Sequence, residues 1–291
     1  MIGLEVAFLT VFWGWALTAI LFLRNTILPR ALLVATPESL GIPFESVKFY
    51  ATDGIPLDGW ILRAEPERPW LILCHGLGTN RSDLLMLAAR LHTARFNLLL
   101  FDFRGHGTSG GRGTSFGWLE QRDLEGALAF LGAHAGVPAR PYGVYGVSMG
   151  GAVAIMTAAR DERIGAVAVE SPYTNLQESL QRHMQLFYPM IPRQPFGWFM
   201  LATYRLRFGV WPDSVAPVHS AAALSPRPLL LIQAEQDVRM PLAEARRILD
   251  AAGEPKALWI VKGGGHLEAF GLQPEEYGQR LKTFFELALG S

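Results

Sequence analysis

This 291-residue sequence has one cysteine and no excess of either charge. The first fact excludes a domain held by internal disulfides, and the second argues against a nucleic-acid-binding protein. The one cysteine, Cys74, lies in the apolar run "WLILC" and cannot form an internal disulfide, so it is expected in the core. Lys plus Arg and Asp plus Glu each number 26 and basic residues do not cluster, so nothing suits a nucleic-acid backbone. No His/Cys group has zinc spacing, and we expect neither a metal nor a cofactor.

Long uncharged runs are also rare, with an exception at the N-terminus. Residues 6–23 carry no charge, and as a helix they reach ~27 Å, close to the hydrocarbon thickness of a bilayer. Because Glu5 precedes the run and Arg24 and Arg30 follow it, we predict an uncleaved membrane anchor over residues 1–28 with the next domain in the cytoplasm. A signal peptide and a helix packed on the domain are alternatives. The anchor could also pair with its copy in a homodimer.

After a linker at residues 29–45, short apolar runs alternate with amphipathic stretches of helical spacing. Strands are expected at residues 46–52, 57–64, 70–75, 97–103, 142–147, 164–170, 228–234 and 257–263. Helices are expected at residues 80–93, 116–134, 149–160, 241–252 and 274–289. This alternation predicts an α/β core over residues 46–172 and 217–291, with a mostly parallel sheet and an antiparallel first pair.

Residues 173–216 interrupt the alternation. They carry four prolines and many aromatic and methionine side chains, and the stretch is too long and too apolar for a simple loop. We predict a helical cap over an apolar cleft; the alternative is that these side chains only pack the insert onto the sheet. The substrate-binding side chains predicted here are Met184, Phe187, Tyr188, Phe196, Trp198 and Phe199.

The stretch "GVYGVSMGG" at residues 143–151 fits the pattern G-x-S-x-G around Ser148, between an expected strand and an expected helix. The glycines leave room for a turn on which the serine takes a strained backbone conformation. Its Oγ would then lie at the carboxyl edge of the sheet, beside the free N–H groups of a helix start. Ser148 is therefore the candidate nucleophile.

A serine hydroxyl needs a histidine base and an orienting carboxylate, here in the order Ser, Asp or Glu, His. His266 follows the last expected strand in "VKGGGHLEAF", where three glycines permit a flexible loop. It is favoured over His219, which is expected to begin or support a helix. Asp237 follows the strand in "LLLIQAEQD" and is the candidate acid, with Glu235 in reserve.

An acyl-transfer site also needs two N–H donors for the oxyanion that forms during attack. One is expected from Met149, the residue after the nucleophile. The other is expected from Leu77 in the loop "CHGLGTN" after the third strand. His75 in the same loop is expected to order the loop and to take no part in catalysis.

The segments "HGLGTN", "FDFRGHGTSGG", "GVSMGG", "LLLIQAEQD" and "GGGHLEAF" occur in the order and spacing of the α/β-hydrolase superfamily, which residues 40–289 resemble. The resemblance implies an α/β-hydrolase fold with a mostly parallel sheet of about eight strands, a cap after the sixth strand, and a triad at Ser148, Asp237 and His266. The HG-x oxyanion loop is similar to that of esterases and lipases. The N-terminal helix is similar to that of membrane-bound members that act on lipids.

The sequence thus predicts a membrane-anchored serine hydrolase acting on a small-molecule or lipid ester. The Met-rich insert favours an aliphatic acyl chain, and it has no cluster of Arg or Lys for phosphate or carboxylate. One rival is a peptidase or amidase on the same triad, which would need a charged subsite such as one built from Glu170 or Glu178. The other is a non-catalytic membrane scaffold.

Overall fold

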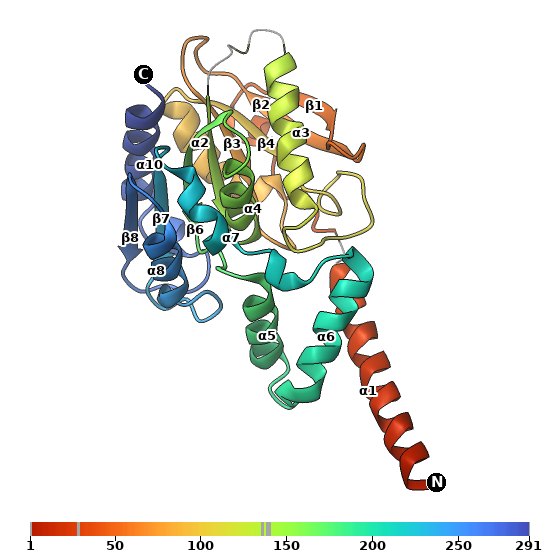
Figure 1. The fold of residues 1–291 in the computed structure, drawn as a ribbon. Helices are drawn as coiled ribbons and strands as arrows, with labels where there is room; N and C mark the ends of the chain where they lie inside the picture. The colour runs from red at the N-terminus through yellow and green to blue at the C-terminus, as the bar shows by residue number, and fades with distance from the viewer. Residues whose placement is uncertain (1, 28–29, 135–136, 138–140, 291) are drawn as a thin grey trace.

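An eight-stranded sheet forms the centre of the computed structural model, which describes residues 2–27, 30–134, 137 and 141–290 (Figure 1). The strands are β1 Glu45–Tyr50, β2 Pro56–Leu62, β3 Trp70–Cys74, β4 Asn97–Phe101, β5 Tyr142–Val147, β6 Ile164–Glu170, β7 Leu229–Ala234 and β8 Lys256–Val261. Their order is β1-β2-β4-β3-β5-β6-β7-β8. Strand β2 is antiparallel to β1 and β4, and the other neighbours are parallel. The predicted sheet is confirmed.

Helices cover both faces of the sheet. On one face lie η2 Arg81–Leu84, α2 Leu85–Thr93, α9 Ala269–Leu272 and α10 Pro274–Leu289, with η1 Pro37–Leu40 beside α2. On the other face lie α3 Glu120–Ala133, α4 Met149–Ala158, α7 Pro217–Ser220, η4 Ala221–Leu224 and α8 Leu242–Ala251. Each predicted core helix has a counterpart here, with ends that differ by a few residues.

The two faces bury two apolar cores. Along β3, Trp70, Ile72 and Cys74 join the core beneath α3, α4 and α8, whereas Leu71 and Leu73 join the core beneath α2 and α10. Since successive side chains of a strand point to opposite faces, a strand covered on both faces is apolar throughout. This is why "WLILC" is a continuous apolar run.

The predicted cap region contains two helices and a short turn beyond one end of the sheet (Figure 1). They are α5 Leu176–Phe187, α6 Arg193–Phe208 and η3 Pro212–Ser214. Two tyrosines tie this cap to the core: the Tyr204 hydroxyl donates to the Ser115 carbonyl at 3.0 Å, and the Tyr173 hydroxyl donates to the Phe116 carbonyl at 2.6 Å. The cap is thus fastened beside the carboxyl ends of the strands.

Helix α1, Ile2–Thr26, packs along α6 of the cap (Figure 1). Near its end Phe22 is buried, with its ring centroid 5.8 Å from that of Phe116 and 6.2 Å from that of Tyr204. The Thr114 N–H donates to the Thr26 carbonyl at 3.0 Å, which fixes the end of the helix to the core. The last turns of α1 are therefore part of the folded domain.

Within the described residues, no helix combines the length and the apolar character needed to cross a membrane. The structure thus gives no support to the predicted anchor, and the predicted boundary at residues 28–29 lies outside the described residues. Part of the apolar run packs against protein, as the packed-helix alternative expects. Arg30, one of the two charges used to orient the anchor, donates to the Gly111 carbonyl at 2.7 Å. An apolar run alone cannot show whether its neighbour is lipid or protein.

Replacing Phe22 with alanine should lower the free energy of unfolding by about 3 kcal/mol, because the truncation leaves a cavity between α1, the cap and the core. Ile20→Ala on the same helix is the matched control. Ile20 is 63% exposed, so its truncation should change the free energy of unfolding by less than about 0.5 kcal/mol. Urea unfolding without detergent measures both. Equal effects would contradict the packing of α1 described above.

Candidate active site

Ser148 lies on the sharp turn between β5 and α4, with φ 51° and ψ −115°. A positive φ is strained for a residue with a side chain, so its surroundings must hold it there. A Cβ atom on Gly146 would lie 2.4 Å from the Gly150 carbonyl oxygen, and one on Gly150 would lie 2.3 Å from the Cys74 carbonyl oxygen. The glycines of G-x-S-x-G therefore permit the close contact between β5, α4 and β3 on which the turn depends.

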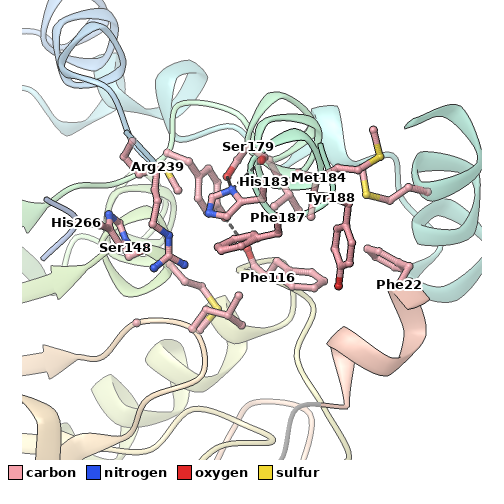
Figure 2. Close-up of a pocket in the computed structure, with 18 of the residues that line it drawn as sticks. Phe22, Phe116, Ser148, Ser179, His183, Met184, Phe187, Tyr188, Arg239 and His266 are labelled. Carbon is pink, nitrogen blue, oxygen red and sulfur yellow. Dashed lines mark hydrogen bonds between the residues drawn. The ribbon is translucent and has the colours of Figure 1, made fainter. Parts of the chain in front are cut away.

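The structure brings together the three side chains predicted to form the triad. The Nε2 atom of His266 lies 3.1 Å from the Oγ atom of Ser148 (Figure 2), and its Nδ1 atom lies 2.8 Å from the Oδ2 atom of Asp237. The three residues follow β5, β7 and β8, whose carboxyl ends share one edge of the sheet. Because Nδ1 faces a carboxylate it carries the ring proton, which leaves the Nε2 lone pair for the serine hydroxyl.

Backbone N–H groups orient the carboxylate of Asp237. Its Oδ1 atom accepts from the N–H of Arg239 at 2.9 Å and of Met240 at 2.8 Å, so Oδ2 remains for His266. Burial alone would raise the pKa of Asp237, but the hydrogen bond and charge of His266, with the Met240 N–H, hold that pKa below its ordinary value. The carboxylate is thus ionised at neutral pH and can stabilise an imidazolium.

The reserve candidates lie elsewhere. Glu235 is exposed, and its Oε2 atom accepts from the Gly263 N–H at 3.3 Å. His219 is exposed on α7. Neither has a hydrogen bond with Ser148 or His266 among the described residues.

The glycine run before His266 has the conformation that the loop needs. Gly263 and Gly264 have φ of 72° and 71°, in the left-handed region that glycine enters without steric cost. Just beyond, the Ala269 N–H donates at 3.3 Å to the Oε1 atom of the buried Glu170, whose Oε2 atom accepts from the Tyr277 hydroxyl at 2.7 Å. The loop that carries His266 is thus anchored just after the histidine.

Neither acidic residue considered for an amine-binding subsite lies in the cleft. Glu170 is used in the buried network beneath the loop, and Glu178 forms an ion pair with Arg247 at 2.6 Å. Among the residues that the structure describes, no group of three or more His, Cys, Asp or Glu side chains could hold a metal ion. The described lining of the cavity therefore contains no carboxylate that could bind an amine.

Leu77 and Met149, predicted to supply the oxyanion donors, both line the cavity that contains Ser148. Met149 is the first residue of α4, where backbone N–H groups have no partner within the helix. His75 orders the neighbouring loop: its Nε2 atom accepts from the Phe103 N–H at 3.0 Å and its Nδ1 atom lies 2.7 Å from the Gly76 carbonyl. Burial, together with the nearby His106, lowers the pKa of His75 well below its usual value, so the ring is neutral.

A cavity of about 700 Å³ opens beside Ser148 and His266, between core, cap and α1 (Figure 2). Four of the six predicted substrate-binding residues line it: Met184, Phe187, Tyr188 and Phe196. Trp198 and Phe199 do not. Trp198 is 68% exposed on the outer side of α6, and Phe199 lies near Gly14 of α1. Trp198 lies two positions after Phe196, so it points to another side of α6. Phe199 lies one turn after Phe196, with its ring centroid 6.1 Å from that of Phe196, but its ring packs toward α1.

Several lining residues were not predicted. The cap also contributes Leu176, Leu180, Ser179, His183, Ile191 and Met200; the core contributes Phe116, Arg239, Met240 and Leu267; and α1 contributes Thr18, Leu21 and Phe22. The spacing of four residues from 176 to 180 to 184 on α5, and from 196 to 200 on α6, was a usable signal for the cap residues. The sequence carried no local signal for the approach of α1 and Arg239.

Asp237→Asn should lower kcat/KM for a p-nitrophenyl ester by about four orders of magnitude, because an amide group facing His266 favours the wrong ring tautomer. Glu235→Gln, two residues away, is the control and should leave the rate near that of the wild type. Circular dichroism and melting temperature verify that both variants fold. A comparable loss in the two variants would argue against the assignment of the acid to Asp237.

Comparison with known proteins agrees with this fold. Residues 71–280 match the Alpha/beta hydrolase family. The uncharacterized protein Rv2307c of Mycobacterium tuberculosis is 30% identical over 218 residues, 74% of this chain and 69% of its own. YqkD of Bacillus subtilis, also uncharacterized, is 27% identical over 240 residues, 80% and 76% of the two chains. The Pyrococcus furiosus esterase Pf2001 has a TM-score of 0.75 at 25% identity, with 90% of this chain and 100% of its own covered. This chain therefore belongs to the Alpha/beta hydrolase family.

Proposed function

We propose that the protein is a serine hydrolase that cleaves carboxylic esters with an apolar acyl chain. The observation that carries this proposal is the pair of distances at His266: 3.1 Å to the Ser148 hydroxyl and 2.8 Å to the Asp237 carboxylate, at the end of an apolar cavity. The similarity to a structure described as an esterase supports it. Family membership alone would not, because one fold hosts many reactions.

The proposed reaction has two stages, acylation of Ser148 and hydrolysis of the acyl-enzyme. As the Ser148 Oγ atom attacks the acyl carbonyl, its proton passes to Nε2 of His266, and Asp237 stabilises the imidazolium. The N–H groups of Leu77 and Met149 stabilise the oxyanion, at about 3–4 kcal/mol for each donor. The imidazolium then protonates the leaving alcohol, and an acyl-enzyme remains. Water enters, loses a proton to Nε2 and attacks the acyl group, and the carboxylic acid leaves with Ser148 restored.

The cavity indicates where the acyl chain lies. From Ser148 it extends past Phe116 and Met184 to Phe22 of α1, and Figure 2 shows these side chains along one channel. Most of its lining is aliphatic, aromatic or methionine, and flexible methionine side chains adapt to chains of irregular shape. A medium-length aliphatic chain suits this channel. No observation in the cavity favours a peptide or other amide.

A fluorophosphonate probe should label the wild-type protein and Ser225→Ala, which lacks a surface serine, but not Ser148→Ala. Absence of labelling in folded wild-type protein would favour the non-catalytic scaffold.

With p-nitrophenyl esters, kcat/KM should rise by about two orders of magnitude from acetyl to octanoyl, because each buried methylene contributes up to ~0.8 kcal/mol. A matched anilide should react more slowly than the ester; faster cleavage of the anilide would indicate an amidase. A flat chain-length profile would remove the acyl channel from the proposal.

We also propose that the outer faces of α1 and the cap contact a lipid surface. Large apolar side chains are exposed on both: Trp13 is 66% and Ile20 63% exposed on α1, and Met190 is 92% and Trp198 68% exposed at the cap. Because α1 packs along α6, these side chains belong to neighbouring elements, and exposed apolar groups of this kind suit an interfacial membrane contact. The cytoplasmic location and the homodimer stay predictions.

Replacing Trp13, Ile20 and Trp198 together with serine should reduce co-sedimentation of the protein with phosphatidylcholine vesicles by at least about fivefold, because each exposed apolar group contributes to interfacial binding. Hydrolysis of a water-soluble short-chain ester should persist, since none of the three lines the cavity. Leu287→Ser, at an 83% exposed residue of α10, is the control and should leave co-sedimentation at the wild-type level. Equal sedimentation of the triple variant and the wild type would refute the proposed contact surface.

A further inference from the structure

Arg239 lines the cavity that opens beside Ser148 and His266. It belongs to the loop after β7, two residues beyond Asp237. Its backbone N–H donates to Asp237 at 2.9 Å, so the base of the side chain is fixed relative to the catalytic groups. Its Cζ atom lies 5.6 Å from the centroid of the Phe187 ring, and Figure 2 shows the guanidinium directed between that ring and the catalytic pair.

The charge of Arg239 is not balanced inside the cavity. Among the described residues that line it, Arg239 is the sole Arg or Lys, and none is Asp or Glu. Two other arginines of this region are engaged: Arg182 forms an ion pair with Glu244 at 2.5 Å, and Arg247 pairs with Glu178. No carboxylate of the described chain forms an ion pair with the Arg239 guanidinium. Among the described lining residues, a largely apolar cavity thus has one arginine in addition to its catalytic groups.

We propose that Arg239 binds a negatively charged group on the alcohol side of the substrate ester. This deepens the proposed function and rests on it, because it names the substrate class as single-chain esters whose alcohol carries a phosphate or carboxylate. A guanidinium donates two parallel hydrogen bonds to such a group, and the cation–π contact with Phe187 favours its position in the cavity. Residues 173–216 carry no cluster of Arg or Lys for an anion. Arg239 lies outside that insert, in the loop after β7.

The two ends of the cavity give the substrate its direction. The apolar end, at Met184 and Phe22, suits the acyl chain, and the carbonyl must lie at Ser148. Arg239 is exposed and close to the nucleophile, so it faces the part of the ester that lies nearer to solvent. That part is the alcohol. A charged group there keeps partial contact with water, which lowers the desolvation cost of binding it.

The test compares three esters of the same acyl chain below their micelle concentrations: with glycerol, with glycerol 3-phosphate and with glyceric acid. Wild-type enzyme should show a higher kcat/KM for at least one anionic ester than for the neutral one, and comparison of the two identifies phosphate or carboxylate as the preferred group. In Arg239→Gln the anionic-to-neutral ratio should fall by about tenfold, chiefly through KM. Arg239→Lys should restore part of the ratio, because an ammonium keeps the charge without the paired donors.

Arg193→Gln, which removes a cap arginine outside the cavity lining, is the matched control and should keep the wild-type ratio. A second readout needs no turnover: decyl phosphate should bind folded wild-type protein more tightly than decanol in calorimetry, and Arg239→Gln should remove the difference. Unchanged ratios and unchanged binding in Arg239→Gln would overturn the role of Arg239 while ester hydrolysis stands. Absence of fluorophosphonate labelling together with absence of hydrolysis would overturn the proposed function instead.

Discussion

The left-handed backbone of Ser148 is the constraint on which the site depends. Contact between Gly146 and Gly150 lets α4 begin directly against β5, and two backbone hydrogen bonds hold the turn: Ser148 N–H to the Glu170 carbonyl at 2.8 Å, and Ala152 N–H to the Ser148 carbonyl at 3.0 Å. With the hydroxyl held in this way, the loops after β7 and β8 have only to bring a carboxylate and an imidazole to the same edge of the sheet. Packing and hydrogen bonds beneath the Ser148 hydroxyl thus hold the strained backbone conformation in place.

Much of this arrangement could be predicted because it is encoded locally. A strand with both faces covered is apolar along its whole length, so β3 and β4 are recognisable as apolar runs in the sequence. Parallel strands place their carboxyl ends at one edge of the sheet, so residues that follow them were expected to meet there. The choice of Asp237 over Glu235 also had a local basis. A carboxylate in the turn itself can accept the next N–H groups, those of Arg239 and Met240, whereas Glu235 directly follows β7 and faces solvent.

What could not be predicted depends on how distant elements approach one another. Phe196 and Trp198 are equally apolar in sequence, but the rotation of α6 turns the first toward the cavity and the second outward. The run in α1 reads as apolar in any surroundings, and only its packing on α6 shows that Phe22 meets protein. Arg239 has no motif of its own. The role proposed for it depends on the described lining of the cavity, which includes no Asp or Glu, and no local sequence pattern shows this.

Because α1 forms one wall of the cavity, the residues proposed to react and the residues that shape the cavity come from distant parts of the chain. The groups proposed to react come from segments after β5, β7 and β8. The far end of the cavity is formed by Thr18, Leu21 and Phe22, more than a hundred residues before Ser148. Substitution in that first helix can therefore alter which molecules fit without touching the groups that react with them. Homologues could therefore differ in substrate selectivity through substitutions in α1 and still catalyse the same reaction.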